Sequence, residues 1–117
     1  MNKKKNNEKE MPGNYSVTSF NGTPSNVSLT NATNAFVQIS RNSDTQMTVT
    51  LPDLSTLTTG DYFIIYQTDT FSSHVTLQTA SGSQFIAGTD LSYVLQSLSM
   101  ITLVKLSNTF WGIGAWA

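Results

Sequence analysis

The residues that could carry acid–base or nucleophilic chemistry are few in this sequence of 117 residues. Its one histidine, His74, lies in Phe71-Ser72-Ser73-His74-Val75, which is not the Gly-x-Ser-x-Gly turn that presents a serine nucleophile. A hydrolase needs a nucleophile and a base within hydrogen-bond reach of each other, and no such pair is indicated. We therefore expect His74 to be an ordinary loop or strand-edge residue, and the protein not to be an enzyme.

The five aspartates of the chain do not form a pattern typical of paired-carboxylate catalysis. Each stands beside Gly, Pro, Thr or Ser in a predicted turn: Asp44, Asp53, Asp61, Asp69 and Asp90. Aspartates in turns accept hydrogen bonds from backbone N–H groups, and we expect that role here. Calcium binding through Asp69 or Asp90 stays open, although there is no EF-hand spacing. With one histidine and no cysteine a zinc site is not expected, and we predict no cofactor.

Aromatic and glycine residues offer two further kinds of site. The glycines Gly112 and Gly114 precede no lysine and no predicted helix, so they do not form a phosphate-binding loop. Five aromatic residues could form a platform for stacking sugars or bases: Tyr62, Tyr66, Tyr93, Trp111 and Trp116. Aromatic residues in strands more often serve the core or an interface, and we prefer that interpretation.

The composition excludes several classes of protein. Charged residues make up 11% of the chain, against about 25% in typical soluble domains, while 15 Ser and 17 Thr supply the polarity. So few charges do not suit a coiled coil or a helical bundle. No run of about 18 apolar residues is present, so we expect no membrane span. The net charge of −1 does not indicate a nucleic-acid-binding surface, and the lack of cysteine permits folding in a reducing cytoplasm.

The charges divide the chain into a basic arm and an acidic body. Residues 1–10 hold four lysines and two glutamates, which gives +2, and the lysines are Lys3, Lys4, Lys5 and Lys9. From Met11 onward, Arg41 and Lys105 stand against five aspartates, which gives −3. We predict a flexible arm over residues 1–13 and a single folded domain over 14–117. The arm is interpreted either as a solubilising tail or as a segment that orders on an acidic partner.

Apolar residues of the body alternate with polar ones at the period of a β-strand. In Met47-Thr48-Val49-Thr50-Leu51 the apolar residues share one face and the threonines the other. Residues 53–59 are expected to form one loose turn, with Leu54 and Leu57 tucked under it. About nine short strands separated by turns predict an all-β fold, an antiparallel β-sandwich of jelly-roll-like shape.

Two strands carry apolar residues on both faces, which a strand covered on one side should not do. They are Tyr62-Phe63-Ile64-Ile65-Tyr66 and Met100-Ile101-Thr102-Leu103-Val104. Two tryptophans also fall in the last seven residues, so we expect this terminus to be docked. The second face is expected to meet another subunit, with these interface residues: Tyr62, Ile64, Ile65, Tyr66, Leu103, Trp111 and Trp116.

The segment from Met47 to Trp111 resembles a module of bacteriophage virion proteins found in head fibres, capsid decorations and tail-fibre ends. The resemblance lies in the order of simple β-motifs over 65 residues. These are an alternating strand ending in Leu51-Pro52, Gly60-Asp61-Tyr62-Phe63-Ile64-Ile65, Thr68-Asp69-Thr70, Val75-Thr76-Leu77, a Gly-x-x-Phe-Ile-x-Gly element over residues 82–88, and Ile101-Thr102-Leu103-Val104 with Trp111. The apolar residues after Trp111 depart from that pattern.

The resemblance implies a non-enzymatic virion protein, usually a homotrimer. Because no stalk repeat precedes the fold, we expect a capsid decoration or short head-fibre protein. It would be made in the host cytoplasm and held on the virion surface, bound to the major capsid protein or another virion protein through the arm. The alternative is a tail-fibre head or adhesin module that binds host-surface glycans through loops around Phe71 and His74.

Overall fold

A computed structural model describes residues 16–22, 26–29 and 35–114, with the backbone alone for residues 16–22. The basic arm with Lys3, Lys4, Lys5 and Lys9 lies outside the described residues, and so does Trp116. The predicted roles of these residues therefore stay predictions. Within the described part of the chain, no helix is long and apolar enough to cross a membrane.

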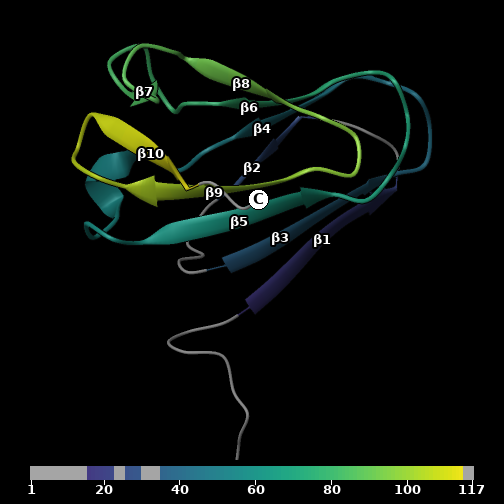
Figure 1. The fold of residues 1–117 in the computed structure, drawn as a ribbon, viewed down its shortest axis with the longest axis horizontal. Helices are drawn as coiled ribbons and strands as arrows, with labels where there is room; N and C mark the ends of the chain where they lie inside the picture. The colour runs from purple at the N-terminus through teal and green to yellow at the C-terminus, as the bar shows by residue number, and fades with distance from the viewer. Residues whose placement is uncertain (1–15, 23–25, 30–34, 115–117) are drawn as a thin grey trace, which may run out of the picture.

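The described residues form two β-sheets that face each other (Figure 1). Sheet A has six strands in the order β1-β3-β5-β9-β10-β7, and sheet B has four in the order β2-β4-β6-β8. From β1 to β9 the chain passes from one sheet to the other at every strand. The strands are β1 (Ser16–Gly22), β2 (Val27–Ser28), β3 (Ala35–Arg41), β4 (Met47–Thr50), β5 (Tyr62–Gln67), β6 (Val75–Gln78), β7 (Phe85–Ile86), β8 (Ser92–Leu95), β9 (Met100–Lys105) and β10 (Phe110–Gly114).

The all-β prediction is confirmed, but the predicted antiparallel arrangement is wrong. Strands β1, β3 and β5 run parallel in sheet A, and β2, β4 and β6 run parallel in sheet B. The reason is the path of the chain: each return to a sheet completes a coil, so consecutive strands of that sheet point the same way. Antiparallel pairing joins β5 to β9, β9 to β10 and β6 to β8. The jelly-roll comparison fails with it, because a jelly roll is antiparallel.

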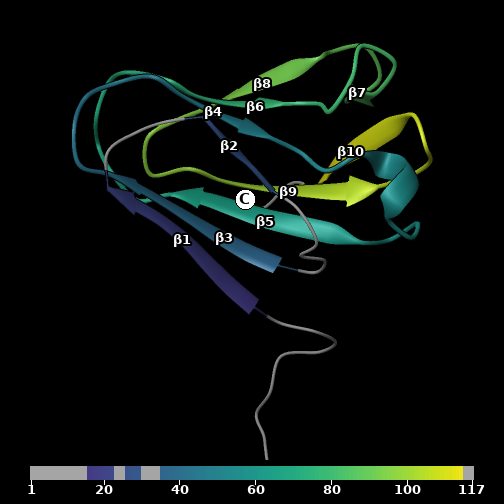
Figure 2. The ribbon, with the colours of Figure 1, turned by 180° about the vertical axis from the view of Figure 1, so that it is seen from behind.

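The core lies between the sheets and is built from alternate residues of each strand. In β3 every second residue from Ala35 is buried, and in β5 the buried positions are Phe63, Ile65 and Gln67. Sheet B contributes its own alternation, with Met47 and Val49 of β4 facing inward. Figures 1 and 2 show the two layers from opposite sides. Period-two alternation therefore fixes which residues form the core.

The loose turn expected over residues 53–59 is confirmed as the 3-10 helix η1 (Leu54–Thr56). Asp53 caps it, since its Oδ1 accepts from the backbone N of Ser55 at 2.9 Å. Leu54 is buried, and Leu57 is nearly so. The buried Lys105 donates from Nζ to the carbonyl of Leu57, which anchors this turn to the end of β9.

Candidate interaction surface

The outer face of sheet A is apolar over its central strands. Because Phe63 and Ile65 of β5 point into the core, Tyr62, Ile64 and Tyr66 point outward, and all three remain half-buried. The register places a further outward residue beside each of them. Ile64 lies between Phe36 of β3 and Thr102 of β9, Tyr62 lies opposite Val104, and Tyr66 lies opposite Met100.

This surface continues across the β9–β10 hairpin. Phe110 pairs in register with Phe85 of β7, and their ring centroids are 6.2 Å apart. Leu106 covers Gly112, where an added Cβ would lie 2.9 Å from Leu106 Cδ1. We name the combined surface the apolar face of sheet A, and it consists of Phe36, Tyr62, Ile64, Tyr66, Phe85, Met100, Val104, Leu106 and Phe110.

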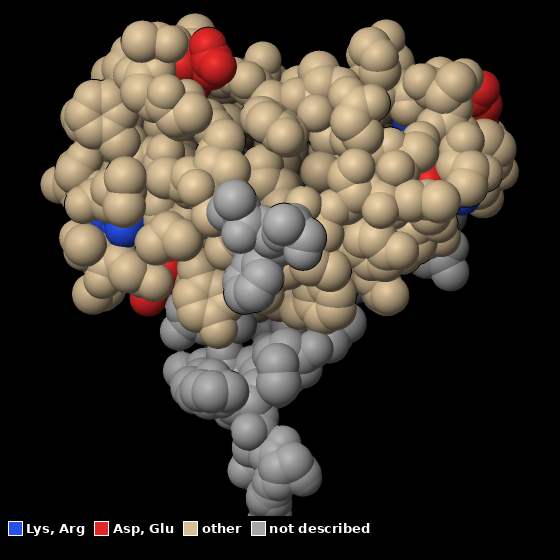
Figure 3. Space-filling model, viewed as in Figure 1, with Lys and Arg blue, Asp and Glu red and all other residues tan. Residues whose placement is uncertain are grey.

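The apolar face of sheet A carries no charged residue. Figure 3 shows that most of the described surface on the side viewed in Figure 1 is uncharged, with only scattered charged side chains. The outer face of sheet B differs in kind. Apart from Val94, which pairs with Thr76, its outward positions are hydroxyl and amide residues. We name these the hydroxyl face of sheet B: Ser28, Thr48, Thr50, Thr76, Gln78 and Ser92.

Six of the seven predicted interface residues fall within the described chain, and the structure divides them into two sets. Tyr62, Ile64 and Tyr66 lie on the apolar face of sheet A. Ile65, Leu103 and Trp111 are core residues with 0% of their surface exposed, so they are not available to a partner. Ile65 and Leu103 occupy inward positions of β5 and β9, and most outward positions of these two strands are apolar as well.

The sequence alone did not show which part of the chain exposes large apolar side chains. All the large hydrophobic residues that are well exposed in the described part of the chain lie between residues 91 and 113. They are Leu91, Tyr93, Val94, Leu98, Met100, Leu106, Phe110 and Ile113. The most C-terminal strands and turns thus expose more large apolar side chains than the parallel coils before them.

Leu98 is a notable member of this set because of its backbone. It occupies the third position of the turn between β8 and β9, which is closed by a hydrogen bond from Ser99 N to Gln96 O at 3.1 Å. Its φ of 59° lies in the left-handed region, which costs a residue with a Cβ about 1–2 kcal/mol. The side chain is 56% exposed, so burial of Leu98 within this chain does not offset that strain.

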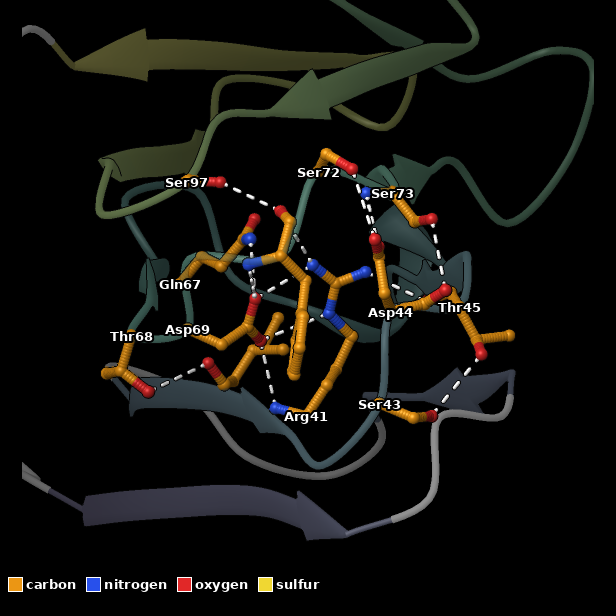
Figure 4. A network of polar contacts seen from close by, with 12 residues as sticks. Arg41, Ser43, Asp44, Thr45, Gln67, Thr68, Asp69, Ser72, Ser73 and Ser97 are labelled. Atoms are coloured by element: carbon orange, nitrogen blue, oxygen red, sulfur yellow. Dashed lines mark hydrogen bonds and ion pairs between the residues drawn. The ribbon is translucent and has the colours of Figure 1, made fainter.

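At one end of the molecule, the loops that join the two sheets are held by a buried ion pair (Figure 4). Arg41, at the end of β3, donates from its Nη2 to Asp69 Oδ1 at 2.8 Å and from its Nε to Oδ2 at 3.1 Å. Both side chains are almost fully buried. Arg41 Nη1 also donates to the carbonyl of Thr45 at 2.8 Å, and its guanidinium lies 5.8 Å from the ring centroid of Phe71. The network clamps two consecutive coils together.

The Asp69 carboxylate is ionised in this environment at neutral pH. Burial alone would raise its pKa, but hydrogen bonds from Arg41 and Gln67 outweigh burial and lower the pKa of Asp69 to about 2. The backbone N–H groups of Arg41 and Phe71 donate to the same carboxylate, at 2.9 and 3.2 Å. Its oxygens thus serve the fold, and the turn role expected for this aspartate is confirmed.

The loops around Phe71 and His74 are occupied by structural contacts. Phe71 is half-buried beneath Arg41, and its carbonyl accepts from the Ser97 hydroxyl at 3.0 Å. Asp44 accepts from the backbone N of Ser73 at 2.8 Å and from the Ser72 hydroxyl at 3.1 Å. These bonds, with Ser73 first, lower the pKa of Asp44. His74 is exposed beside them.

One open pocket of about 320 Å³ lies on the hydroxyl face of sheet B. Its lining comes from β6, the turn that follows it and the start of β8, and includes Thr76, Gln78, Thr79, Ser81 and Ser92. No group of three or more histidine or acidic residues that could hold a metal occurs among the residues that the structure describes. Comparison of the sequence with protein-family models and with curated proteins gave no match.

Proposed function

We propose that this protein is a structural, non-enzymatic protein whose copies assemble through the apolar face of sheet A. The observation that carries the proposal is the contrast between the two outer faces of one fold. Tyr62, Ile64 and Tyr66 point outward from β5, whereas the outward residues of β4 and β6 are hydroxyl or amide residues. Apolar side chains that the core does not need are stabilised by a partner that covers them.

The setting that we propose is the virion of a bacteriophage, as a capsid decoration or short head-fibre protein. The resemblance to the phage module supports this, and it favours a homotrimer on the virion surface. Its motifs fall on successive elements, since Met47-Thr48-Val49-Thr50 forms β4, Tyr62 to Ile65 open β5 and Val75-Thr76-Leu77 opens β6. In this proposal the lysines of the arm bind the major capsid protein or another virion protein.

Deletion of residues 2–10 tests the arm. The truncated protein should keep its far-UV circular dichroism spectrum and its oligomeric state, and it should no longer bind purified empty capsids in a co-sedimentation assay. A matched variant in which Lys3, Lys4, Lys5 and Lys9 are all replaced by Gln should behave like the deletion, because the charge is the proposed binding determinant. Capsid binding equal to that of the full-length protein would show that the arm is not the attachment device.

The pocket on the hydroxyl face of sheet B favours one alternative, a glycan-binding module of a tail fibre or adhesin. Hydroxyl and amide groups around Gln78 and Ser81 could donate and accept hydrogen bonds with sugar hydroxyls, and the exposed Leu91 supplies an apolar wall. A glycan array distinguishes the two functions. Specific binding that is lost in Gln78→Ala would support the alternative, and an array without a binder, together with capsid labelling in immuno-electron microscopy, would eliminate it.

A further inference from the structure

In the described part of the chain, each sheet ends in an edge strand that belongs to the first coil, β1 in sheet A and β2 in sheet B. In sheet A, β1 is hydrogen-bonded to β3, and in sheet B, β2 is hydrogen-bonded to β4. Within the described chain neither strand has a neighbour on its other side. Figures 1 and 2 both place β1 at the outer limit of its sheet, opposite the end where β8 lies. Among the residues that the structure describes, the backbone N–H and C=O groups on the outer side of these two strands therefore have no strand partner.

The edge at β1 lacks the features that usually prevent strand pairing. Natural edge strands are short, charged or interrupted by proline. β1 has seven residues, Ser-Val-Thr-Ser-Phe-Asn-Gly, with neither a charge nor a proline, and the same holds for Val27-Ser28 of β2. The opposite end differs, because β7 has two residues and β8 has four. The long, uncharged edge is thus the one suited to accept another strand.

We propose that the β1 and β2 edges bind the same edges of a second copy of this chain, so that both sheets continue across a two-fold axis. The argument for a second copy is geometric. A single extended peptide would pair with one sheet and leave the other uncovered. A second copy turned about an axis perpendicular to the sheets presents β1 to β1 and β2 to β2 together, and it also covers the end of the core.

The register of β1 makes this pairing self-complementary. Thr18 and Phe20 lie opposite the buried Val37 and Ile39 of β3, so they occupy core-side positions of sheet A. In an antiparallel β1–β1 pair centred on Ser19, Thr18 of each copy lies opposite Phe20 of the other. Core-side positions then meet core-side positions, as continuous faces require.

The same arrangement separates the two basic arms. The arm of each copy enters the fold at Ser16, and in an antiparallel pair the two Ser16 positions lie at opposite ends of the strands. Seven residues of strand span about 20 Å, which is well beyond the screening length of about 8 Å at physiological salt. The points at which the two arms join the fold are therefore farther apart than the screening length.

Disulfide trapping tests the pairing, because the chain contains no cysteine. In Ser19→Cys the two thiols face each other across the axis, where directly opposed residues have Cβ atoms about 4.5–5.5 Å apart. In the control Val17→Cys, which lies on the same face of β1, the two thiols are four residues out of register, or about 13 Å apart. We expect Ser19→Cys to form a covalent dimer at least about tenfold faster on mild oxidation. Equal rates for the two variants would overturn the proposal.

A second pair of variants tests the pairing of β1 with β1 without introducing cysteine. Ser19→Lys places two ammonium groups opposite each other across the axis, whereas Ser19→Gln is a neutral side chain of similar length. Sedimentation velocity should show the two-fold association in wild type and Ser19→Gln but not in Ser19→Lys. The association should also persist in Ile64→Lys, which separates this contact from the proposed assembly through the apolar face of sheet A. An Ile64→Lys protein that sediments as a monomer would contradict the proposal.

Discussion

The outer faces of the two sheets are built by the same alternation and carry opposite kinds of residue. In β4 the inward Met47 and Val49 alternate with threonines, whereas in β5 the inward Phe63 and Ile65 alternate with Tyr62, Ile64 and Tyr66. The inward residues of both strands are almost fully buried. The core is therefore complete without apolar residues on the outer face of sheet B.

This comparison shows that the outward apolar residues of β5 and β9 are not needed to close the core. A hydroxyl-rich strand such as β4 packs just as well on its inward side. Our proposal that other copies of the chain cover this face accounts for the apolar residues at the outward positions of sheet A.

The Arg41–Asp69 clamp holds together the loops that follow β3 and β5, two neighbouring strands of sheet A. Arg41→Ala leaves the buried Asp69 carboxylate without its main partner, which should lower the free energy of unfolding by about 3–5 kcal/mol. Urea denaturation followed by tryptophan fluorescence measures the change. The control Asp44→Ala removes exposed hydrogen bonds of the same loops and should lower the free energy of unfolding much less than Arg41→Ala does. Similar losses for both variants would show that the clamp is unimportant.

Acid should weaken the same clamp in a defined range of pH. The folded-state pKa of Asp69 is about 2, below its ordinary value of 3.8, so its contribution is present above about pH 4 and is lost as the pH falls towards 2. The shift corresponds to about 2 kcal/mol. Because the pKa values of Asp44 and Asp53 are also lowered, the informative measurement is the difference between wild type and Asp69→Asn. That difference should shrink between pH 4 and pH 2, and a constant difference would contradict the assignment.

Two substitutions at Leu98, in the strained turn, distinguish an effect on stability from an effect on assembly. Leu98→Gly relieves the positive φ and should raise the free energy of unfolding by about 1 kcal/mol, since the lost side chain is exposed. Leu98→Ala keeps the strain and should change stability by less than about 0.5 kcal/mol. Thermal denaturation compares the two variants. If the exposed leucine serves a contact, both variants should associate more weakly than wild type, and unchanged association would place Leu98 outside the interface.

Alternation allowed the strands, the core and the η1 turn to be predicted, but it could not give strand direction. An apolar–polar repeat looks the same in parallel and antiparallel sheets, and pairing such as Ala35 with Phe63 joins residues 28 positions apart. The two strands with apolar residues on both faces were recognised from the sequence. The predicted interface nevertheless included Ile65 and Leu103, because a list of apolar residues does not show which of them point into the core. The strand register of the structure shows which of them point inward and which point outward.

The Arg41–Asp69 clamp had a signal in the sequence that was missed. Arg41 continues the inward alternation of Val37 and Ile39, although its position before a polar loop suggested solvent. Gln67 and Lys105 continue the inward alternation of β5 and β9 in the same way, and both are buried. A polar residue at an inward position of a strand end therefore indicates a buried polar contact. Its partner could not be predicted, because Asp69 lies 28 residues away from Arg41.

The most direct measurement compares one lysine substitution on each outer face. Ile64→Lys and Thr76→Lys both place a charge at an outward, half-buried position of a central strand, in sheet A and sheet B respectively. Sedimentation velocity at micromolar concentration, with urea denaturation to check that both variants are folded, reports their association. The account predicts that Ile64→Lys loses the assembly formed through this face while Thr76→Lys retains it. Equal assembly of both variants, or a wild-type protein that sediments as a monomer, would contradict it.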